Sequence, residues 1–423
     1  MTDATIAPDP GIPRRFAALR NKDSRPYLFA AGLSMMADNN EHVITYWVLW
    51  EKFHSPALVG FEVISHWLPF LLLSVWFGEL AQRYDCRRLI QIAQGIFMLV
   101  SVLWGVLFLT GTLQIWEACI LLVLHGCAGA LWSPAEQLML HDFVERKDLP
   151  SAVRLNATFR SLGVLFGPVV GSALLLGLGS TWGIFANVLF YIPMTIVMAR
   201  TAFNGHTRDA RDVAASPRVG LVSSLRLLGE LRSNRLLVSM IVLAGLVAIT
   251  IGGALQVAMP TFANALGAGT AGLAYGVLLL ANGVGGVLGG FFLEATGLLK
   301  PNARSAIIAT VAFGALILVF AVTHSYVIAI VALVLAGVAN IASASITQSI
   351  VQLEAPPEDR GRVYGVYGVF ANGLRTGNGI TLGVLGALLG IPFSIALCAG
   401  LLVVGALASG LYGWSGRRKE RAA

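Results

Sequence analysis

A series of long apolar runs constrains the fold of this chain more than any other feature. A helix needs about 20 mostly apolar residues to cross a membrane, and twelve runs of about this length follow one another in two sets of six. The first set covers residues 27–49, 57–79, 89–110, 115–138, 155–176 and 180–199, and the second covers 236–258, 270–293, 303–322, 326–349, 363–389 and 392–414. Charged residues make up only 12% of the chain, whereas soluble proteins carry about 25%. The sequence therefore predicts an all-α membrane protein with twelve transmembrane helices.

Basic residues support this count and orient the helices. If the N-terminus lies in the cytoplasm, Lys52 is the only basic residue in the outer loops, and the other Lys and Arg clusters fall in inner segments. This is the positive-inside pattern. We expect a multi-pass protein of the inner (cytoplasmic) membrane with both termini cytoplasmic. Its predicted parts are an N-terminal tail at 1–26, a six-helix bundle at 27–200, a linker at 201–235, a second six-helix bundle at 236–414 and a tail at 415–423.

Several classes of protein fit the sequence poorly. The net charge of +7 follows from the loop bias, so we predict no nucleic-acid partner. We find no nucleophile elbow, phosphate loop or metal-ligand spacing, and the four cysteines have neither metal-like nor disulfide-like spacing. We therefore predict no enzyme, no cofactor and no resident metal. Residues 1–26 lack the apolar core and cleavage site of a signal peptide.

Two further features of the sequence predict structure. Residues 219–237 space leucines and arginines at helical intervals, which predicts an amphipathic helix on the inner leaflet or a linker helix that continues into the seventh span. Six helices followed by six suggest a duplicated half. When the fifth and eleventh runs are aligned, Arg154 meets Arg362 and Gly171 meets Gly379.

The loop after the second run carries a family motif. Residues 78–89, GELAQRYDCRRL, resemble the signature of the major facilitator superfamily, although Gln82 replaces its Asp and Asp85 replaces its Gly. GPVVG at 167–171 resembles the antiporter motif of the fifth helix. The whole chain is most similar to the branch that holds the enterobactin exporter and macrolide or multidrug efflux pumps. This resemblance implies two pseudo-symmetric six-helix bundles that rock around a central site, and export by proton antiport.

The resemblance also implies two gating regions. One is an inner latch in the loop, whose charge pair Gln82 weakens; its residues are Gly78, Arg83, Asp85, Arg87 and Arg88. The arginines alternatively serve only as cytoplasmic anchors at a helix end. The other region is Gly167, Pro168 and Gly171, which thin one face of the fifth helix and favour close packing, bending or both.

Ionisable residues inside the apolar runs are the least expected feature. Asp38 lies about 17 Å along the first run, near the middle of the bilayer, and shares a helix face with residues three and four positions later. An ionised side chain at this depth costs at least about 2.5–3.5 kcal/mol, so we expect the ionisable side chains in these runs to face water or a partner rather than lipid. They are Asp38, Glu41 and His42 in the first run, Glu62 and His66 in the second, and His125 in the fourth.

The chemistry of these side chains leaves three interpretations. An acid beside a histidine can exchange a proton near neutral pH, so we predict that Asp38 carries a coupled proton and that Glu41 and His42 are relay or substrate contacts. Glu62, His66 and His125 are further candidates for proton coupling or substrate binding. A static hydrogen-bonded cluster and contact with a metal ion or metal chelate are the alternatives.

Two arginines also lie inside predicted spans. Arg160 is about 9 Å from the inner end of the fifth helix and can extend to the surface. Arg375 is about 20 Å into the eleventh helix, too deep to do so. Spans 2 and 11 are neighbours in this superfamily, so we hypothesise an Arg375–Glu62 ion pair that closes the outer side and breaks when that side opens.

The sequence thus predicts a secondary active transporter that exports a small amphiphilic molecule, a drug-like compound or a siderophore, in exchange for protons. Such efflux can provide multidrug resistance or siderophore export. The expected partners are the small-molecule substrate, protons and the lipid bilayer, and we expect a monomer. A proton-coupled importer or facilitator is one alternative. A non-transporting membrane sensor or assembly protein is the other, and it would not need Asp38.

Overall fold

The computed structural model describes residues 15–207, 234–252, 255, 259, 262, 266, 273–377, 385–386 and 388–420, and within these residues it contains helices and no strand. The all-α prediction is therefore confirmed. Most of the predicted N-terminal tail, most of the proposed amphipathic helix at 219–237, and Gly379 lie outside the described residues.

The N-terminal half, residues 17–200, holds the first six predicted spans. A short helix α1 (Ala17–Arg20) precedes α2 (Ser24–Phe53), α3 (Pro56–Arg83), α4 (Cys86–Thr110) and α5 (Ile115–Phe143). The long helix α6 (Leu149–Arg200) contains both the fifth and the sixth span, which are separated at Gly179 with φ of 76°. Because glycine adopts positive φ without steric cost, Gly179 reverses the chain between two membrane helices without a longer loop.

The C-terminal half, residues 235–420, holds the other spans. It contains α8 (Arg235–Thr250), α10 (Leu273–Thr296), α11 (Ala303–Val322) and α12 (Tyr326–Glu354). The eleventh span begins as α13 (Arg360–Gly368) and continues as a π-helical segment, η5 (Val369–Gly373), and the last span is α15 (Ile391–Glu420). By length and composition alone, seven helices of the described residues can cross a membrane, and α6 contributes two of the predicted spans.

Local sequence signals set where several helices begin and end. Ser55 accepts a hydrogen bond from the Leu58 amide at the start of α3, and Asp85 accepts one from the Arg87 amide at the start of α4. Asn302 caps α11 in the same way. Such caps satisfy amide groups that have no partner within the helix. Gly111, with φ of 70°, ends α4 in the left-handed conformation.

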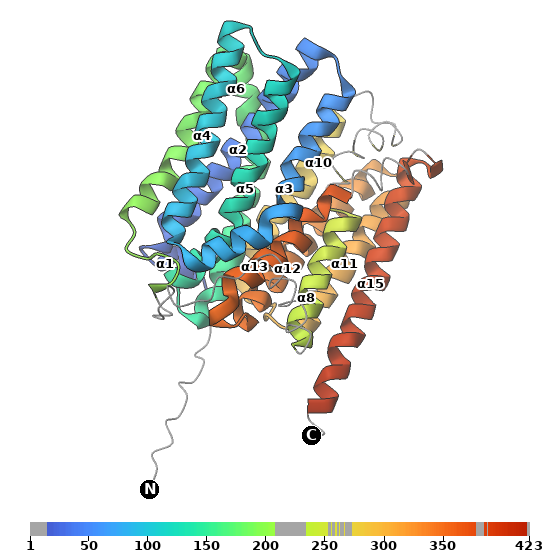
Figure 1. Cartoon of the computed structure of the whole chain (residues 1–423). Coiled ribbons are helices and arrows are strands. Elements are labelled where there is room, and N and C mark those ends of the chain that lie inside the picture. Colours follow the sequence, from blue (N-terminus) through green and yellow to red (C-terminus); the bar gives the residue numbers. More distant parts are fainter. Residues whose placement is uncertain are drawn as a thin grey trace.

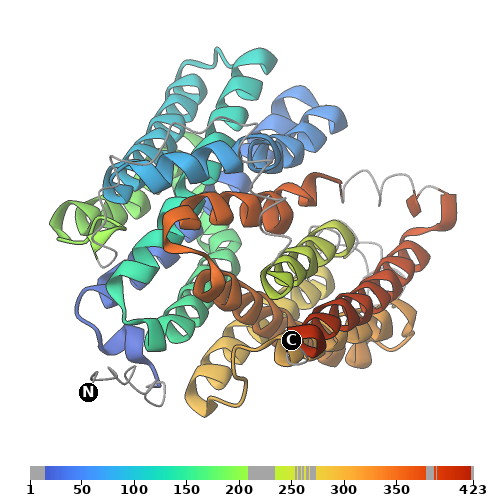
Figure 2. The ribbon, with the colours of Figure 1, turned by 60° about the horizontal axis from the view of Figure 1, so that its bottom comes forward.

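The two halves repeat one packing pattern. In the N-terminal half α2 packs on α6, α3 on α5 and α4 on α6. The corresponding pairs in the C-terminal half are α8 with η5, α10 with α12, and α11 with α15. Figures 1 and 2 show the halves as two neighbouring groups, one coloured blue to green and the other yellow to red. The predicted six-plus-six duplication therefore appears as two pseudo-symmetric bundles.

The halves share an apolar core at one end of the molecule, the end that carries the α3–α4 turn and lies low in Figure 1. We call this the α3–α4 end. Buried side chains of α3, such as Phe77, belong there to the same cluster as Val363 and Tyr364 of α13. Toward the opposite end each half has a separate cluster, one around Trp104 and one around Phe320.

Glycines bring α3 and α13 very close together at the α3–α4 end. A Cβ atom on Gly78 would overlap the carbonyl oxygen of Gly361, and a Cβ atom on Gly361 would overlap the carbonyl oxygen of Gly78. No side chain fits at either position, because a Cβ atom cannot approach backbone atoms so closely. The expectation that spans 2 and 11 are neighbours is thus confirmed.

Polar contacts reinforce this end. Gln82 donates from Nε2 to the Pro357 carbonyl at 3.2 Å and accepts a hydrogen bond from the Gly361 amide at 2.5 Å. Glu294 at the end of α10 accepts from Arg154 at 2.7 Å and from Ser151 at 2.5 Å, both on α6. The amide of Phe16 also donates to Glu294, at 2.7 Å. The segment before α1 therefore helps to join the two halves.

Replacing Gly78 with alanine is expected to open the α3–α4 end. The added Cβ meets the backbone of Gly361 and Gly365, and overpacking of this kind costs about 1–3 kcal/mol. Separation of the halves relieves the clash. Spin labels at the exposed positions Tyr84 and Lys300, in a background without native cysteines, should show longer distances by double electron–electron resonance.

The matched control is Gly95→Ala in α4, where an added Cβ would meet no neighbouring atom within 4 Å. This variant should keep the wild-type distances. Identical distance distributions for wild type and Gly78→Ala would contradict the account of this end.

Candidate functional site

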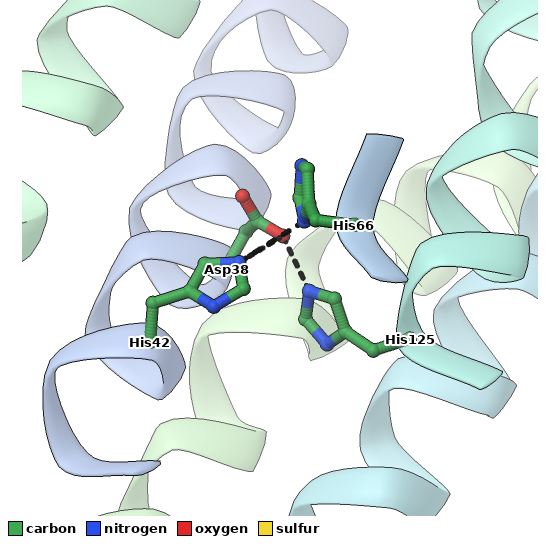
Figure 3. Close-up of side chains that lie close together, drawn as sticks. All are labelled: Asp38, His42, His66 and His125. Carbon is green, nitrogen blue, oxygen red and sulfur yellow. Dashed lines mark hydrogen bonds and ion pairs between the residues drawn. The ribbon is translucent and has the colours of Figure 1, made fainter. Parts of the chain in front are cut away.

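The ionisable residues predicted from the sequence converge inside the N-terminal half. His125 of α5 lies between two carboxylates of α2: its Nε2 is 2.6 Å from Oδ1 of Asp38, and its Nδ1 is 2.9 Å from Oε1 of Glu41. Asp38 and Glu41 are three positions apart, so both point to the same side of α2. Figure 3 shows His125 reaching toward Asp38 from the neighbouring helix.

A second chain of contacts joins α2 to α3. His42 places Nδ1 at 3.1 Å from Oε1 of Glu62 and Nε2 at 3.1 Å from Nδ1 of His66. The hydroxyl of Thr45 donates to the same oxygen of Glu62 at 2.8 Å. His42 therefore lies at the centre of the group, with Asp38 4.0 Å from its Nε2.

The group has a buried side and an open side. The side chains of Glu41 and His125 are 3% exposed and that of Glu62 is fully buried, whereas the side chains of Asp38 and His42 are 11% and 20% exposed. On the buried side, the ring of the buried Phe97 lies edge-on to His125.

At His66 the group lies near the C-terminal half. The guanidinium of Arg375 lies 4.7 Å from the ring centroid of Trp67, within cation–π range. Trp67 in turn contacts the ring of His66 edge-on. An aromatic and cationic side-chain pair from the two halves thus borders the group of ionisable residues.

Close packing on the other face of α2 holds these side chains in place. A Cβ on Gly167 of α6 would overlap Cβ of Asn39, and one on Gly171 would lie 3.0 Å from Cα of Asn40. Asn40 also donates to the side chain of Asn187 at 3.1 Å. These glycines therefore let α2 lie against α6, as the packing interpretation predicts. A gating role for Gly167, Pro168 and Gly171 stays a prediction.

The hypothesised Glu62–Arg375 ion pair is not formed in this structure. Glu62 is bonded to His42 and Thr45, and Arg375 stacks on Trp67 and donates to the Ala371 carbonyl at 3.3 Å. The halves are joined here at the α3–α4 end. With that end in the cytoplasm, as the sequence predicts, this is the arrangement in which the hypothesis has the pair broken. Pairing in the opposite arrangement stays a prediction.

The residues predicted to form the inner latch divide into two sets. Gly78 contacts the C-terminal half directly, as does Gln82. Arg83 pairs with Glu79 on its own helix at 2.7 Å, and Arg87 pairs with Asp85 at 2.7 Å and donates to the Thr201 carbonyl at 2.9 Å. Burial alone raises the pKa of Asp85, but the hydrogen bonds from Arg87 lower it below its ordinary value.

Residues that the sequence analysis did not single out complete two networks. Ser101 of α4 donates to Glu41. Glu136 of α5, only 2% exposed, accepts from Arg160 at 2.8 Å and from Asn156 at 2.7 Å. Arg160 therefore has a buried partner and does not depend on reaching the surface. Glu136 stands in an otherwise apolar segment, so the energetic cost that singled out Asp38 in the sequence also applies to Glu136.

Residues 14–413 match the family described as transmembrane secretion effector. The chain belongs to this family of the major facilitator superfamily. Members of the superfamily are multi-pass membrane transporters rather than enzymes, and the all-α fold agrees with that class.

A curated relative of this chain is the staphyloferrin A transporter of Staphylococcus aureus. The two are 28% identical over 130 residues, which is 30% of this chain and 33% of the relative. The match thus spans about a third of the relative's length.

Solved structures share the fold over nearly the whole chain. The fucose:proton symporter FucP of E. coli, in the outward conformation, superimposes with a TM-score of 0.70 at 15% identity, covering 91% of this chain and 98% of the other. The human organic anion transporter MFSD10 gives 0.68 at 13% identity, covering 91% and 99%. At such identity the likeness concerns the fold alone.

Replacing His125 with leucine is expected to destabilise the protein strongly. The change leaves the carboxylates of Asp38 and Glu41 buried without their shared partner, and loss of one partner from a buried ionic contact costs about 3–5 kcal/mol. The measurement is the midpoint of thermal unfolding of the purified protein in detergent.

Two further variants sharpen this test. The exposed His324 offers a control, since His324→Gln should shift stability by no more than about 0.5 kcal/mol. Adding Asp38→Asn and Glu41→Gln to His125→Leu should recover part of the loss, because no ionised carboxylate stays unpaired. If His125→Leu unfolds at the wild-type temperature, the two contacts do not exist as described.

Proposed function

We propose that this protein is a proton-driven exporter of a small amphiphilic molecule, and that Asp38, His125 and Glu41 form the unit that carries the coupled proton. Transport proceeds by alternating access between the two halves. The α3–α4 end faces the cytoplasm in this proposal, as the basic residues predict.

The position of His125 between two carboxylates carries this proposal. Each of its ring nitrogens faces a carboxylate oxygen, at 2.6 Å and 2.9 Å. A hydrogen must lie between each nitrogen and its oxygen, because two lone pairs at that distance repel. The three groups therefore need two shared hydrogens to hold this geometry. If one hydrogen leaves, one contact between α2 and α5 must open, so proton occupancy is linked to helix packing.

Asp38 is the natural point of entry to this unit. Its side chain is 11% exposed, whereas those of Glu41 and His125 are 3% exposed. In the proposed cycle, protons load Asp38 from outside while the α3–α4 end is closed. They leave to the cytoplasm after that end opens. His42 and His66 adjoin Asp38, and Glu62 contacts His42. These three residues provide a relay or substrate contacts.

Two observations support a siderophore or a related amphiphile as the substrate. The curated relative is named for staphyloferrin A, and siderophore transport is consistent with the family described as transmembrane secretion effector. Arg375 and Trp67 form a cationic and aromatic pair beside the ionisable group. Such a pair suits a molecule that carries both a carboxylate and apolar surface.

The test is transport by purified protein in lipid vesicles, with a pH gradient imposed in either direction. The compound panel includes carboxylate and catecholate iron chelators and cationic drugs. We expect uptake of at least one compound against the direction of proton flow. Asp38→Asn should abolish this pH-driven flux, because an amide cannot take up and release a proton at neutral pH.

Glu51 provides a matched control, since it is a carboxylate at the exposed end of the same helix. Glu51→Gln should retain pH-driven flux. Flux in the same direction as the protons would instead identify an importer. A wild-type-like gradient response in Asp38→Asn would contradict the role of the proposed unit.

A further inference from the structure

We infer that Asp38, His42, His66 and His125 form a binding site for a divalent transition-metal ion. Their donor atoms come from three helices, α2, α3 and α5, and all lie within 4.8 Å of one another. Figure 3 shows the four side chains directed toward a common point. This inference concerns binding and holds whether or not the chain exports an organic molecule.

The distances between the donor atoms fit a metal of ordinary size. A tetrahedral ion with bonds of about 2.0–2.1 Å holds its ligand atoms about 3.3 Å apart. Here Nε2 of His42 is 3.1 Å from Nδ1 of His66 and 4.0 Å from Oδ1 of Asp38, and Nε2 of His125 is 2.6 Å from the same Oδ1. The hydrogens that these paired atoms share leave to water as the ion binds, because each atom must offer a lone pair to the metal. Small side-chain rotations would then bring these separations to the value that a metal requires.

The outer contacts of the histidines favour the same interpretation. A metal-bound imidazole usually donates its second N–H to a carboxylate, which fixes the ring and increases its strength as a ligand. Nδ1 of His42 faces Glu62 at 3.1 Å, and Nδ1 of His125 faces Glu41 at 2.9 Å. Both rings thereby present Nε2 toward the common point.

The donor set indicates the class of ion. Imidazole ligands suit Zn²⁺, Cu²⁺, Ni²⁺ and Fe²⁺, whereas Mg²⁺ and Ca²⁺ prefer oxygen donors. Three imidazoles and one carboxylate therefore select a divalent transition metal. An ion can approach from the open side of the group, where His42 and Asp38 are partly exposed. Its charge would also offset that of the surrounding carboxylates.

Cobalt provides a direct probe of this site, because tetrahedral Co²⁺ has intense visible absorption and substitutes for Zn²⁺. The full-length protein is purified without a histidine tag and titrated with Co²⁺ in lipid nanodiscs. We expect one-to-one binding with a tetrahedral spectrum that added Zn²⁺ abolishes. His66→Gln should lose this spectrum, and it leaves the contacts of His125 with Asp38 and Glu41 intact.

Two other variants complete the experiment. His54→Gln removes an exposed histidine outside the cluster and should leave binding unchanged. Glu62→Gln should weaken binding by about 10–100-fold, the usual effect of losing an outer carboxylate. Elution of each variant as the wild-type species in size-exclusion chromatography shows that it is folded.

The inference is overturned if the folded wild-type protein gives no tetrahedral Co²⁺ spectrum, or if His66→Gln retains it unchanged. The titration uses neither a pH gradient nor an organic substrate. Loss of transport with intact metal binding would therefore refute the proposed function alone, and the reverse result would refute the metal site alone.

Discussion

The structure depends on how ionised groups are accommodated among apolar helices, where each unpartnered charge is costly. His125 resolves this for two carboxylates at once. Asp38 and Glu41 lie on one side of α2, at a spacing that lets a single imidazole from α5 reach both. Glu62 is accommodated by the same principle through His42 and Thr45. The helices α2, α3 and α5 are thus joined by polar contacts inside an apolar bundle.

The glycine and apolar contacts that join the halves at the α3–α4 end lie apart from this polar group. At the α3–α4 end, Gly78 and Gly361 allow the backbones to meet, and buried apolar residues of both halves form one core. Toward the other end each half keeps its own core. Arg375 connects the C-terminal half to the ionisable group, since it stacks on Trp67 beside His66. Movement of the halves would therefore alter the surroundings of the ionisable group directly.

Much of the architecture could be predicted from the sequence, because the length of apolar runs and the placement of basic residues follow from the bilayer itself. The six candidate residues could be found by the cost of burying them, and helical spacing placed Asp38, Glu41 and His42 on one face. Partners on different helices could not be found in this way. Spacing within one helix does not show that His125 joins both carboxylates, that Glu136 receives Arg160, or that four donor atoms from three helices converge.

The most direct test of this account asks whether the open side of the ionisable group meets water or lipid. Cysteine is placed at position 42 in a background without native cysteines, and its reaction with a charged, membrane-impermeant thiol reagent is measured in vesicles. A cysteine at Leu99, an exposed apolar position on α4, which packs on α5 and α6 of its own half, serves as the reference for a position away from the site. The account predicts that the cysteine at 42 reacts readily and that the cysteine at 99 does not. An unreactive cysteine at 42 in the folded protein would contradict it.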